Sequence, residues 1–265
     1  MPTTRFDHFR QLHDPARPLL LPNAWDAGSA RLFESLGAAA VATSSAAVAW
    51  ALGYPDGYKL PTEVAVSLAA NIARVVKVPV SIDIEDGYSD DPAAVAETVL
   101  RLIDAGVVGI NLEDGPRPAE LLAAKIERIK DETAKRGVSA FVNARTDVFL
   151  AGLAPSSERV AETLHRAALY TQAGADGLFV PALVNPDDIR AVVAGIQLPL
   201  NVLAWNGLAP SAELGRLGVS RLSAGSGISQ VLWKHAEDLA KAFLAGGKSE
   251  TLAGQMPYGQ LQNLF

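Results

Sequence analysis

Residues 105–114, Ala-Gly-Val-Val-Gly-Ile-Asn-Leu-Glu-Asp, hold the pattern that decides the fold. A helical segment ends at a glycine, and a short apolar strand follows and runs into two acids. A glycine between small or apolar residues also stands at three further changes from helix to strand, namely Leu36-Gly37-Ala38, Ala173-Gly174-Ala175 and Leu217-Gly218-Val219. Glycine supplies the left-handed conformation that ends a helix. The chain is therefore predicted to alternate helices with parallel strands.

Eight such units follow one another along the 265 residues. Short apolar runs predict strands over residues 19–22, 39–43, 78–83, 108–112, 140–145, 177–180, 198–203 and 219–222. This size and repeat predict a (β/α)₈ TIM barrel, with residues 1–265 forming one domain. A doubly wound open sheet is the alternative that the pattern leaves open. Residues 246–265 follow as a C-terminal helical tail, which we expect to pack on the barrel or on a partner subunit.

Composition excludes several classes of protein. With 49% apolar and 20% charged residues the chain can bury a large core, so it is not disordered or fibrous. A net charge of −6 without a basic cluster argues against nucleic acid as a partner. The absence of cysteine removes disulfides, thiolate zinc sites and a cysteine nucleophile. The longest apolar stretch, 37–52, is too short to cross a membrane and residues 1–19 lack a signal-peptide core, so we expect a cytoplasmic protein without a membrane partner.

Charged side chains gather at the ends of three consecutive predicted strands. Because alternate side chains of a strand face opposite ways, Asp83 and Glu85 share the inward face of the third strand, and Asn111 and Glu113 share that of the fourth. Arg145 has the same position at the end of the fifth strand. Active sites of these barrels lie at the carboxyl ends of the strands. This end is therefore the predicted active site.

The predicted site contains more negative charge than a partly dry pocket can hold alone. Asp83, Glu85 and Glu113 would raise one another's pKa values unless they are protonated or a cation is present. Oxygen ligands without a nearby cysteine or histidine favour a hard ion, Mg²⁺ or, alternatively, Mn²⁺. Asp56, in the loop after the second strand, is a candidate fourth carboxylate. Arg145 carries the planar fork that suits a substrate carboxylate, and we assign Asp56 and Arg145 as candidate catalytic residues.

Other polar residues receive weaker assignments. Asn201 and Trp205, near the end of the seventh strand, are candidates for lining the substrate pocket. Asp86 and Asp114 point away from the site by strand parity and are expected to form caps or ion pairs, and Asp147 is expected to cap the helix that follows it. Residues 224–227 resemble a phosphate cradle but also an ordinary turn. The four histidines lie away from the strand ends, where packing or surface roles are expected: His8, His13, His165 and His235.

Five motifs in register give the chain a family resemblance. It resembles the isocitrate lyase and phosphoenolpyruvate mutase superfamily over nearly its whole length. The matching segments are Leu20-Leu21-Pro22-Asn23-Ala24-Trp25-Asp26-Ala27, Leu52-Gly53-Tyr54-Pro55-Asp56, Asp83-Ile84-Glu85-Asp86-Gly87-Tyr88, Asn111-Leu112-Glu113-Asp114 and Asn143-Ala144-Arg145-Thr146-Asp147.

The resemblance implies a magnesium shell, with Asp83 as the direct ligand. Metal-bound waters would be held by three further carboxylates, Asp56, Glu85 and Glu113. Arg145 matches the arginine that binds a substrate carboxylate. The family's Ser-Gly pair, whose backbone amides bind substrate oxygens, corresponds here to Ser44-Ser45, so the glycine is missing. With Thr43 and Asp83, these two residues complete the expected substrate-binding set.

Two departures from the family narrow the expected reaction. The chain lacks the Lys-Lys-Cys-Gly-His loop of the lyases, and its 115–119 loop is shorter than the gating loop of the mutases and hydrolases. Decarboxylation of an oxaloacetate-like 2-oxo acid through a metal-stabilised enolate is the reaction that depends least on residues missing from this chain. It is the first expectation, ahead of an isocitrate- or methylisocitrate-type lyase and a C–C or P–C hydrolase.

Functions of other classes stay open at this point. One is a protein that binds a 2-oxo acid without turning it over, and another is a sugar-phosphate barrel enzyme with an anion bound at 225–227. The resemblance also implies a homo-oligomer, a dimer or tetramer, in which terminal helices are exchanged between subunits.

Overall fold

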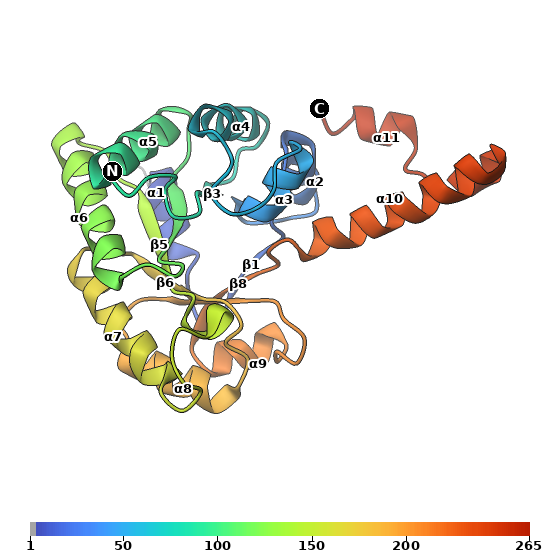
Figure 1. The fold of residues 1–265 in the computed structure, drawn as a ribbon. Helices are drawn as coiled ribbons and strands as arrows, with labels where there is room; N and C mark the ends of the chain where they lie inside the picture. The colour runs from blue at the N-terminus through green and yellow to red at the C-terminus, as the bar shows by residue number, and fades with distance from the viewer. Residues whose placement is uncertain (1–3) are drawn as a thin grey trace.

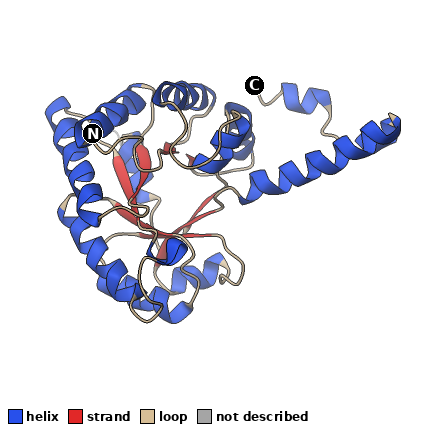
Figure 2. Ribbon diagram, in the orientation of Figure 1, coloured by secondary structure: helices blue, strands red, loops and turns tan. Residues whose placement is uncertain are grey.

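The computed structural model describes residues 4–265, and its strands form a ring with helices outside it (Figure 2). The strands are β1 (Leu19–Leu21), β2 (Val41–Ala42), β3 (Val80–Asp83), β4 (Gly109–Glu113), β5 (Phe141–Arg145), β6 (Gly177–Val180), β7 (Leu200–Leu203) and β8 (Val219–Ser223). The helices before and between them are α1 (Arg5–Gln11), α2 (Ala27–Ser35), α3 (Ser45–Ala51), α4 (Thr62–Val75), α5 (Pro92–Asp104), α6 (Ala119–Arg136), the π-helix η1 (Val148–Gly152), α7 (Arg159–Gln172), α8 (Pro186–Gly195) and α9 (Ser211–Arg216).

All neighbouring strands are parallel, in the order β1-β8-β7-β6-β5-β4-β3-β2. The two end strands are joined beyond their regular ladders by a parallel bridge between Ala24 and Thr43, in which Ala24 N donates to Ala42 O over 2.7 Å. The ring of strands is therefore a nearly closed (β/α)₈ barrel, as predicted. The alternative of an open doubly wound sheet is wrong, because β1 pairs with β8 as well as approaching β2.

The repeated glycines lie where helices give way to strands, as predicted. Gly106 and Gly218 have φ values of +99° and +95°, which side chains on L-residues rarely adopt. A Cβ at Gly218 would also lie 2.5 Å from a methyl group of Val193 in α8. These glycines thus allow the sharp return of the chain and the close contact between neighbouring units.

The main core lies between the barrel strands and the surrounding helices. Strand parity is confirmed here, since Ile82, Ile110 and Val142 face outward and are at most 2% exposed, within this core. At the amino end of the barrel, α1 closes the interior by inserting Phe9, whose ring packs edge-on against Phe141 with centroids 5.2 Å apart. Phe9 thus fills the amino end of the barrel interior, whereas the predicted active site lies at the carboxyl end.

The C-terminal segment does not follow the barrel. Helix α10 (Gly227–Gly246) extends away from it, and η2 (Ser249–Leu252) and α11 (Tyr258–Gln262) come after α10 (Figure 1). The end of the tail contacts α2, where Arg31 Nε donates to Leu264 O over 2.6 Å. None of the helices described between residues 4 and 265 is long and apolar enough to span a bilayer.

Candidate active site at the carboxyl end of the barrel

The carboxyl ends of β3, β4 and β5 bring the predicted charged residues together. In the strand register Asp83 lies beside Asn111, and Glu113 lies beside Arg145. Pairing continues past the end of β3, where Glu113 N donates to Glu85 O over 2.9 Å. Glu85 takes a left-handed backbone conformation, with φ of +53°, which is uncommon for a residue with a side chain. The strand ends and this bend therefore place Asp83, Glu85 and Glu113 in one region.

Arg145 forms ion pairs with two carboxylates. Its Nη1 lies 2.6 Å from Glu113 Oε2, and its Nε lies 2.7 Å from Asp147 Oδ1. The expectation that Asp147 caps the following helix is wrong, because its side chain makes no capping bond to η1. Asp147 instead pairs with Arg145, two residues away in the sequence. A hydrogen bond between two charged groups is stronger than one to a neutral backbone amide. Arg145 is consequently held in a fixed direction over the carboxylates.

Tyr58, which the sequence analysis missed, connects the loop after α3 to this region. Its backbone N–H donates to Glu85 Oε2, and its hydroxyl donates to Glu113 Oε1 over 3.0 Å. The guanidinium of Arg117 lies over the Tyr58 ring at 5.3 Å from its centroid. A Cβ at Gly115 would lie 2.7 Å from the Tyr58 hydroxyl. The short loop after β4 is therefore shaped to receive Tyr58.

Burial and mutual repulsion raise the pKa values of the carboxyl groups. Burial raises the pKa of Glu113 to about 8, although Arg145 and the Tyr58 hydroxyl both act to lower it. Burial likewise raises the pKa of Glu85 to about 7, where the Tyr58 N–H acts in the opposite direction. The pKa of Asp56 is raised by burial first and by the charge of Asp83 second. Asp83 contributes to all three shifts, so the four carboxyl groups are close enough to interact.

This donor set fits Mg²⁺ better than a metal that needs a complete protein cage. No three histidine or acidic side chains in the described part of the chain converge into such a cage. Mg²⁺ commonly keeps several waters and is bound through one or two carboxylates. Asp83 is oriented by two hydrogen bonds, from Glu85 N over 3.1 Å and from Asn111 Nδ2 over 3.2 Å. Asp83 is therefore a suitable candidate for the direct ligand, and the roles of Asp56, Glu85 and Glu113 in holding metal-bound waters stay predictions.

The candidate substrate residues at the end of β2 lie beside Asp83. Thr43 Oγ1 accepts a hydrogen bond from Asp83 N over 2.9 Å. Ser44 N already donates to Ala24 O over 3.2 Å, whereas Ser45 begins α3. Backbone N–H groups of a first helical turn have no partner within the helix. Of this pair, Ser45 is thus the better candidate for a backbone donor to substrate.

Asn201 and Trp205 occupy different environments. Asn201 is buried inside the barrel, where it accepts from Asn143 Nδ2 over 3.1 Å and donates to Ser223 Oγ over 3.1 Å. Trp205, after β7, is 47% exposed. Asn201 therefore belongs to a polar layer beneath the carboxylates, while Trp205 lies at the surface, and their roles in substrate binding stay predictions.

Asp86 and Asp114 form the ion pairs expected for them. Asp86 lies 2.8 Å from Arg117 Nη1. Asp114 lies 2.9 Å from Arg166 Nη1 of α7 and accepts a hydrogen bond from the Tyr170 hydroxyl over 2.6 Å. These pairs anchor the ends of the loop that follows β4.

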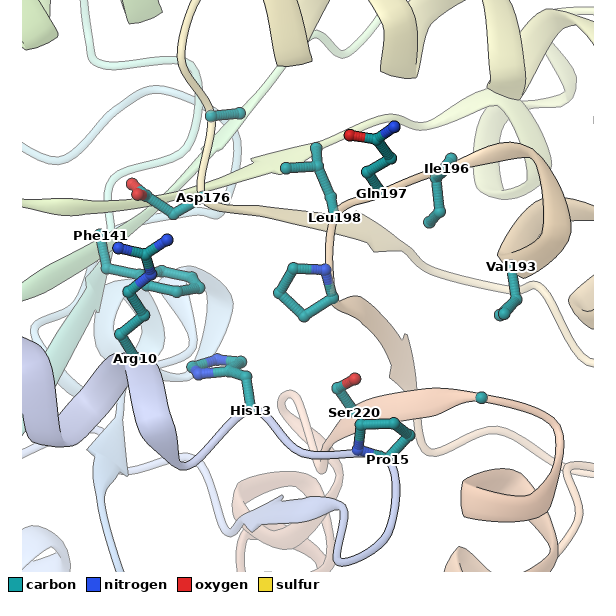
Figure 3. Close-up of a pocket in the computed structure, with 13 residues that line it drawn as sticks. Arg10, His13, Pro15, Phe141, Asp176, Val193, Ile196, Gln197, Leu198 and Ser220 are labelled. Atoms are coloured by element: carbon teal, nitrogen blue, oxygen red, sulfur yellow. The ribbon is translucent and has the colours of Figure 1, made fainter.

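A separate cavity of about 460 Å³ lies at the amino end of the barrel (Figure 3). Arg10 and His13 reach it from the N-terminal segment, and Asp176 and Ser220 reach it from the starts of strands. The His13 ring stacks on Phe141 with centroids 4.4 Å apart, and burial lowers its pKa to about 3. His13 is a packing residue, as expected. The cavity is remote from the carboxylates and is not the predicted site.

Comparisons with known proteins agree with this architecture. The family model for phosphoenolpyruvate phosphomutase matches residues 9–244. A probable 2-methylisocitrate lyase of Corynebacterium glutamicum is 36% identical over 68% of this chain and 60% of its own length. Oxaloacetate decarboxylase of Ectopseudomonas mendocina is 30% identical over 80% of this chain and 74% of its own length.

Solved structures show the same fold. A crystal structure of a candidate phosphonomutase from Burkholderia cenocepacia is 40% identical, covers 89% of this chain and 99% of its own, and superposes with a TM-score of 0.85. The family model covers most of the chain, and the charged strand ends described above lie within it. The chain belongs to the isocitrate lyase and phosphoenolpyruvate mutase superfamily.

Proposed function

We propose that the protein is a Mg²⁺-dependent enzyme that cleaves a carbon–carbon bond of a small 2-oxo acid, with decarboxylation of an oxaloacetate-like substrate as its reaction. One observation carries the proposal. Three carboxyl groups, those of Asp56, Glu85 and Glu113, interact with an oriented Asp83, while Arg145 pairs with Glu113. A cation at this site would offset the repulsion between the carboxylates and an anionic substrate, and Arg145 offers the substrate a second positive group.

Each residue of the site has a proposed role that follows from its position. When bound, Mg²⁺ supplies positive charge that draws electrons from the keto group of a chelating 2-oxo acid. Asp83 would hold the ion, and Asp56, Glu85 and Glu113 would orient its waters. Arg145 directs the substrate carboxylate.

The loop after β4 favours decarboxylation over the lyase reaction. It passes from Asp114 to the start of α6 at Ala119 in four residues and contains no cysteine. Arg117 holds this loop by pairing with Asp86 and Asp90, both over 2.8 Å. Loss of CO₂ leaves the electron pair on the keto acid and needs no proton donor at the moment of cleavage. The 36% identity to a probable 2-methylisocitrate lyase keeps lyase action on a related acid as the second candidate.

A substrate panel tests the proposal. Purified protein is incubated with oxaloacetate, isocitrate, 2-methylisocitrate and phosphonopyruvate, each with Mg²⁺ and with EDTA, while pyruvate, glyoxylate, acetate and phosphate are followed. Pyruvate from oxaloacetate above the rate with Mg²⁺ alone is expected. Glyoxylate with succinate from isocitrate, pyruvate with succinate from 2-methylisocitrate, or acetate with oxalate from oxaloacetate, would contradict decarboxylation and identify a lyase or hydrolase. Binding without turnover of any substrate would indicate a non-catalytic binder.

We also propose that the protein acts as a homo-oligomer in which α10 packs on a second copy. Six large apolar side chains of α10 are at least 44% exposed: Val231, Leu232, Trp233, Leu239, Phe243 and Leu244. A groove of about 870 Å³ between α2 and α9 is lined by apolar residues including Phe33, Leu36 and Ile228. Exposed apolar surface of this kind marks an interface. Light scattering should give a dimer or tetramer, and a double variant Trp233→Asp and Phe243→Asp should be a monomer; a monomeric wild type would refute the proposal.

A further inference from the structure

Arg221 on β8 is a fully buried arginine, with 0% of its surface exposed. Arg145 and Arg166 pair with Glu113 and Asp114, but no carboxylate of residues 4–265 lies within ion-pair distance of Arg221. Burial lowers the pKa of Arg221 to about 9, and the charge of Asp83 acts in the opposite direction. A buried charge without a partner is destabilising. Apolar branched residues ordinarily fill the interior of such barrels, so this position calls for a functional explanation.

The contacts of Arg221 lead towards the carboxylates. Its Nη2 donates to Asn111 Oδ1 over 3.2 Å, and Asn111 Nδ2 donates to Asp83 Oδ2 over 3.2 Å. Asn143 Nδ2 also donates to Asn111 Oδ1, over 2.9 Å. Two donors on its oxygen fix the direction of the Asn111 amide, so that its NH₂ group faces Asp83. One amide therefore separates the guanidinium from the proposed metal ligand.

The other contacts of Arg221 are weak and neutral. Its Nε lies 3.4 Å from Ser223 Oγ, and its Nη1 has no hydrogen-bond partner among the described residues. The positive charge is thus balanced by no direct neighbour. The nearest excess of negative charge is the carboxylate group above it, which contributes through Asp83.

We propose that Arg221 is a fixed positive charge beneath the active site that raises its affinity for the dianionic 2-oxo acid and lowers its affinity for the free metal ion. This inference rests on the proposed function. At an effective dielectric constant of about 20, a unit charge about 10 Å away changes the affinity for a charged ligand by roughly tenfold or more. The effect of Arg221 on affinity is opposite for the two ligands, because its positive charge attracts the acid and repels Mg²⁺. A purely structural role would weaken both.

The test compares Arg221→Met, which removes the charge at similar length, with Arg221→Lys, which keeps it. Calorimetry measures Mg²⁺ binding to each protein, then the binding of oxalate, an unreactive dianion, to the Mg²⁺-loaded protein. For Arg221→Met we expect Mg²⁺ to bind about tenfold more tightly, oxalate about tenfold more weakly, and an unchanged or higher Tm. Arg221→Lys should stay near the wild type. Arg74→Met, which removes an equal charge from the exposed side of α4, should change neither affinity.

Other outcomes overturn the inference. Loss of both affinities together with a lower Tm in Arg221→Met would show a structural role, and unchanged affinities would show no role. Loss of both in Arg221→Lys as well would show that geometry matters rather than charge. If wild-type protein binds Mg²⁺ and oxalate but does not turn over oxaloacetate, the proposed reaction fails while this comparison still decides the role of Arg221. A wild type that binds neither ligand refutes both.

Discussion

The two ends of the barrel differ in how their charges are balanced. At the amino end, a cavity of about 460 Å³ is bordered by Asp176, which pairs with Lys130, and by His13, which burial keeps neutral. At the carboxyl end, burial raises the pKa values of Glu85 and Glu113, and Asp83 adds to the repulsion. Enclosed space therefore does not identify the active site of this molecule. The active site is identified instead by negative charge that the protein does not fully compensate, because a bound cation can compensate it.

Replacing Asp83 should have the largest effect of the changes considered. If it does not, the proposed difference between the two ends of the barrel is wrong. Asp83→Ala removes the proposed direct metal ligand, so the Mg²⁺-dependent rate should fall by about 10³-fold or more. Rates of pyruvate formation and Mg²⁺ binding by calorimetry check this. Arg10→Ala, which alters the lining of the amino-end cavity, serves as the control and should keep the wild-type rate. An Asp83→Ala protein with normal metal affinity would place the metal elsewhere.

The amino end should respond in stability rather than in activity. Phe9→Ala removes a fully buried ring that packs on Phe141, so the free energy of unfolding should fall by about 3 kcal/mol or more. Urea denaturation measures this change. The kcat of the protein that remains folded should stay within about twofold of the wild type. A large loss of kcat with little loss of stability would mean that the plugged end takes part in catalysis.

The raised pKa values predict how the metal-free protein depends on pH. Glu85 and Glu113 have an ordinary pKa of 4.5, raised to about 7 and about 8 in the folded protein. The folded state therefore holds these protons more tightly than the unfolded chain. The contribution of these two groups to stability should be largest below pH 4.5. The free energy of unfolding should then fall by about 2 kcal/mol or more as the pH rises to 8.

Denaturation in EDTA at several pH values between 5 and 8 measures this fall. Glu113→Gln should reduce the dependence on pH, because it removes one of the two groups. Mg²⁺ should restore stability most strongly at pH 8, since it binds the deprotonated carboxylates. A metal-free protein that gains stability with rising pH over this range would show that Arg145 outweighs burial at Glu113.

The sequence predicted the barrel and the charged strand ends because both depend on periodicity. Glycines ended the helices where expected, and strand parity placed Asp83 and Glu113 inward. Two features escaped this reasoning for different physical reasons. Tyr58 lies in a loop, where no period relates a residue to its neighbours in space. Asp147 was expected to cap a helix, and its preference for Arg145 depends on the direction of a side chain that sequence spacing does not determine.

Arg221 was also missed, although its strand was predicted. The sequence Val219-Ser220-Arg221-Leu222-Ser223 reads as an alternating strand, and a charged residue within it suggests an exposed edge. In a closed barrel that face points into the interior instead. Closure depends on β1 meeting β8, a contact between residues about 200 positions apart that no local pattern reports. Burial of a charge at this position follows from topology, not from local sequence.

The smallest effect is expected at Tyr58 and sharpens the comparison at the carboxyl end. Tyr58→Phe removes the hydroxyl that donates to Glu113 over 3.0 Å but keeps the ring beneath Arg117. Because a hydrogen bond to a carboxylate contributes about 1.5 kcal/mol, kcat/KM should fall about tenfold. Gly115→Ala should produce a similar loss of kcat/KM by displacing the Tyr58 hydroxyl rather than removing it, since its Cβ would lie 2.7 Å from that oxygen. If both act through this contact, adding Gly115→Ala to Tyr58→Phe should cost little more. Tyr54→Phe, in the same loop, is the control with an unchanged rate, and full additivity of the two losses would mean that Gly115 and Tyr58 serve the site independently.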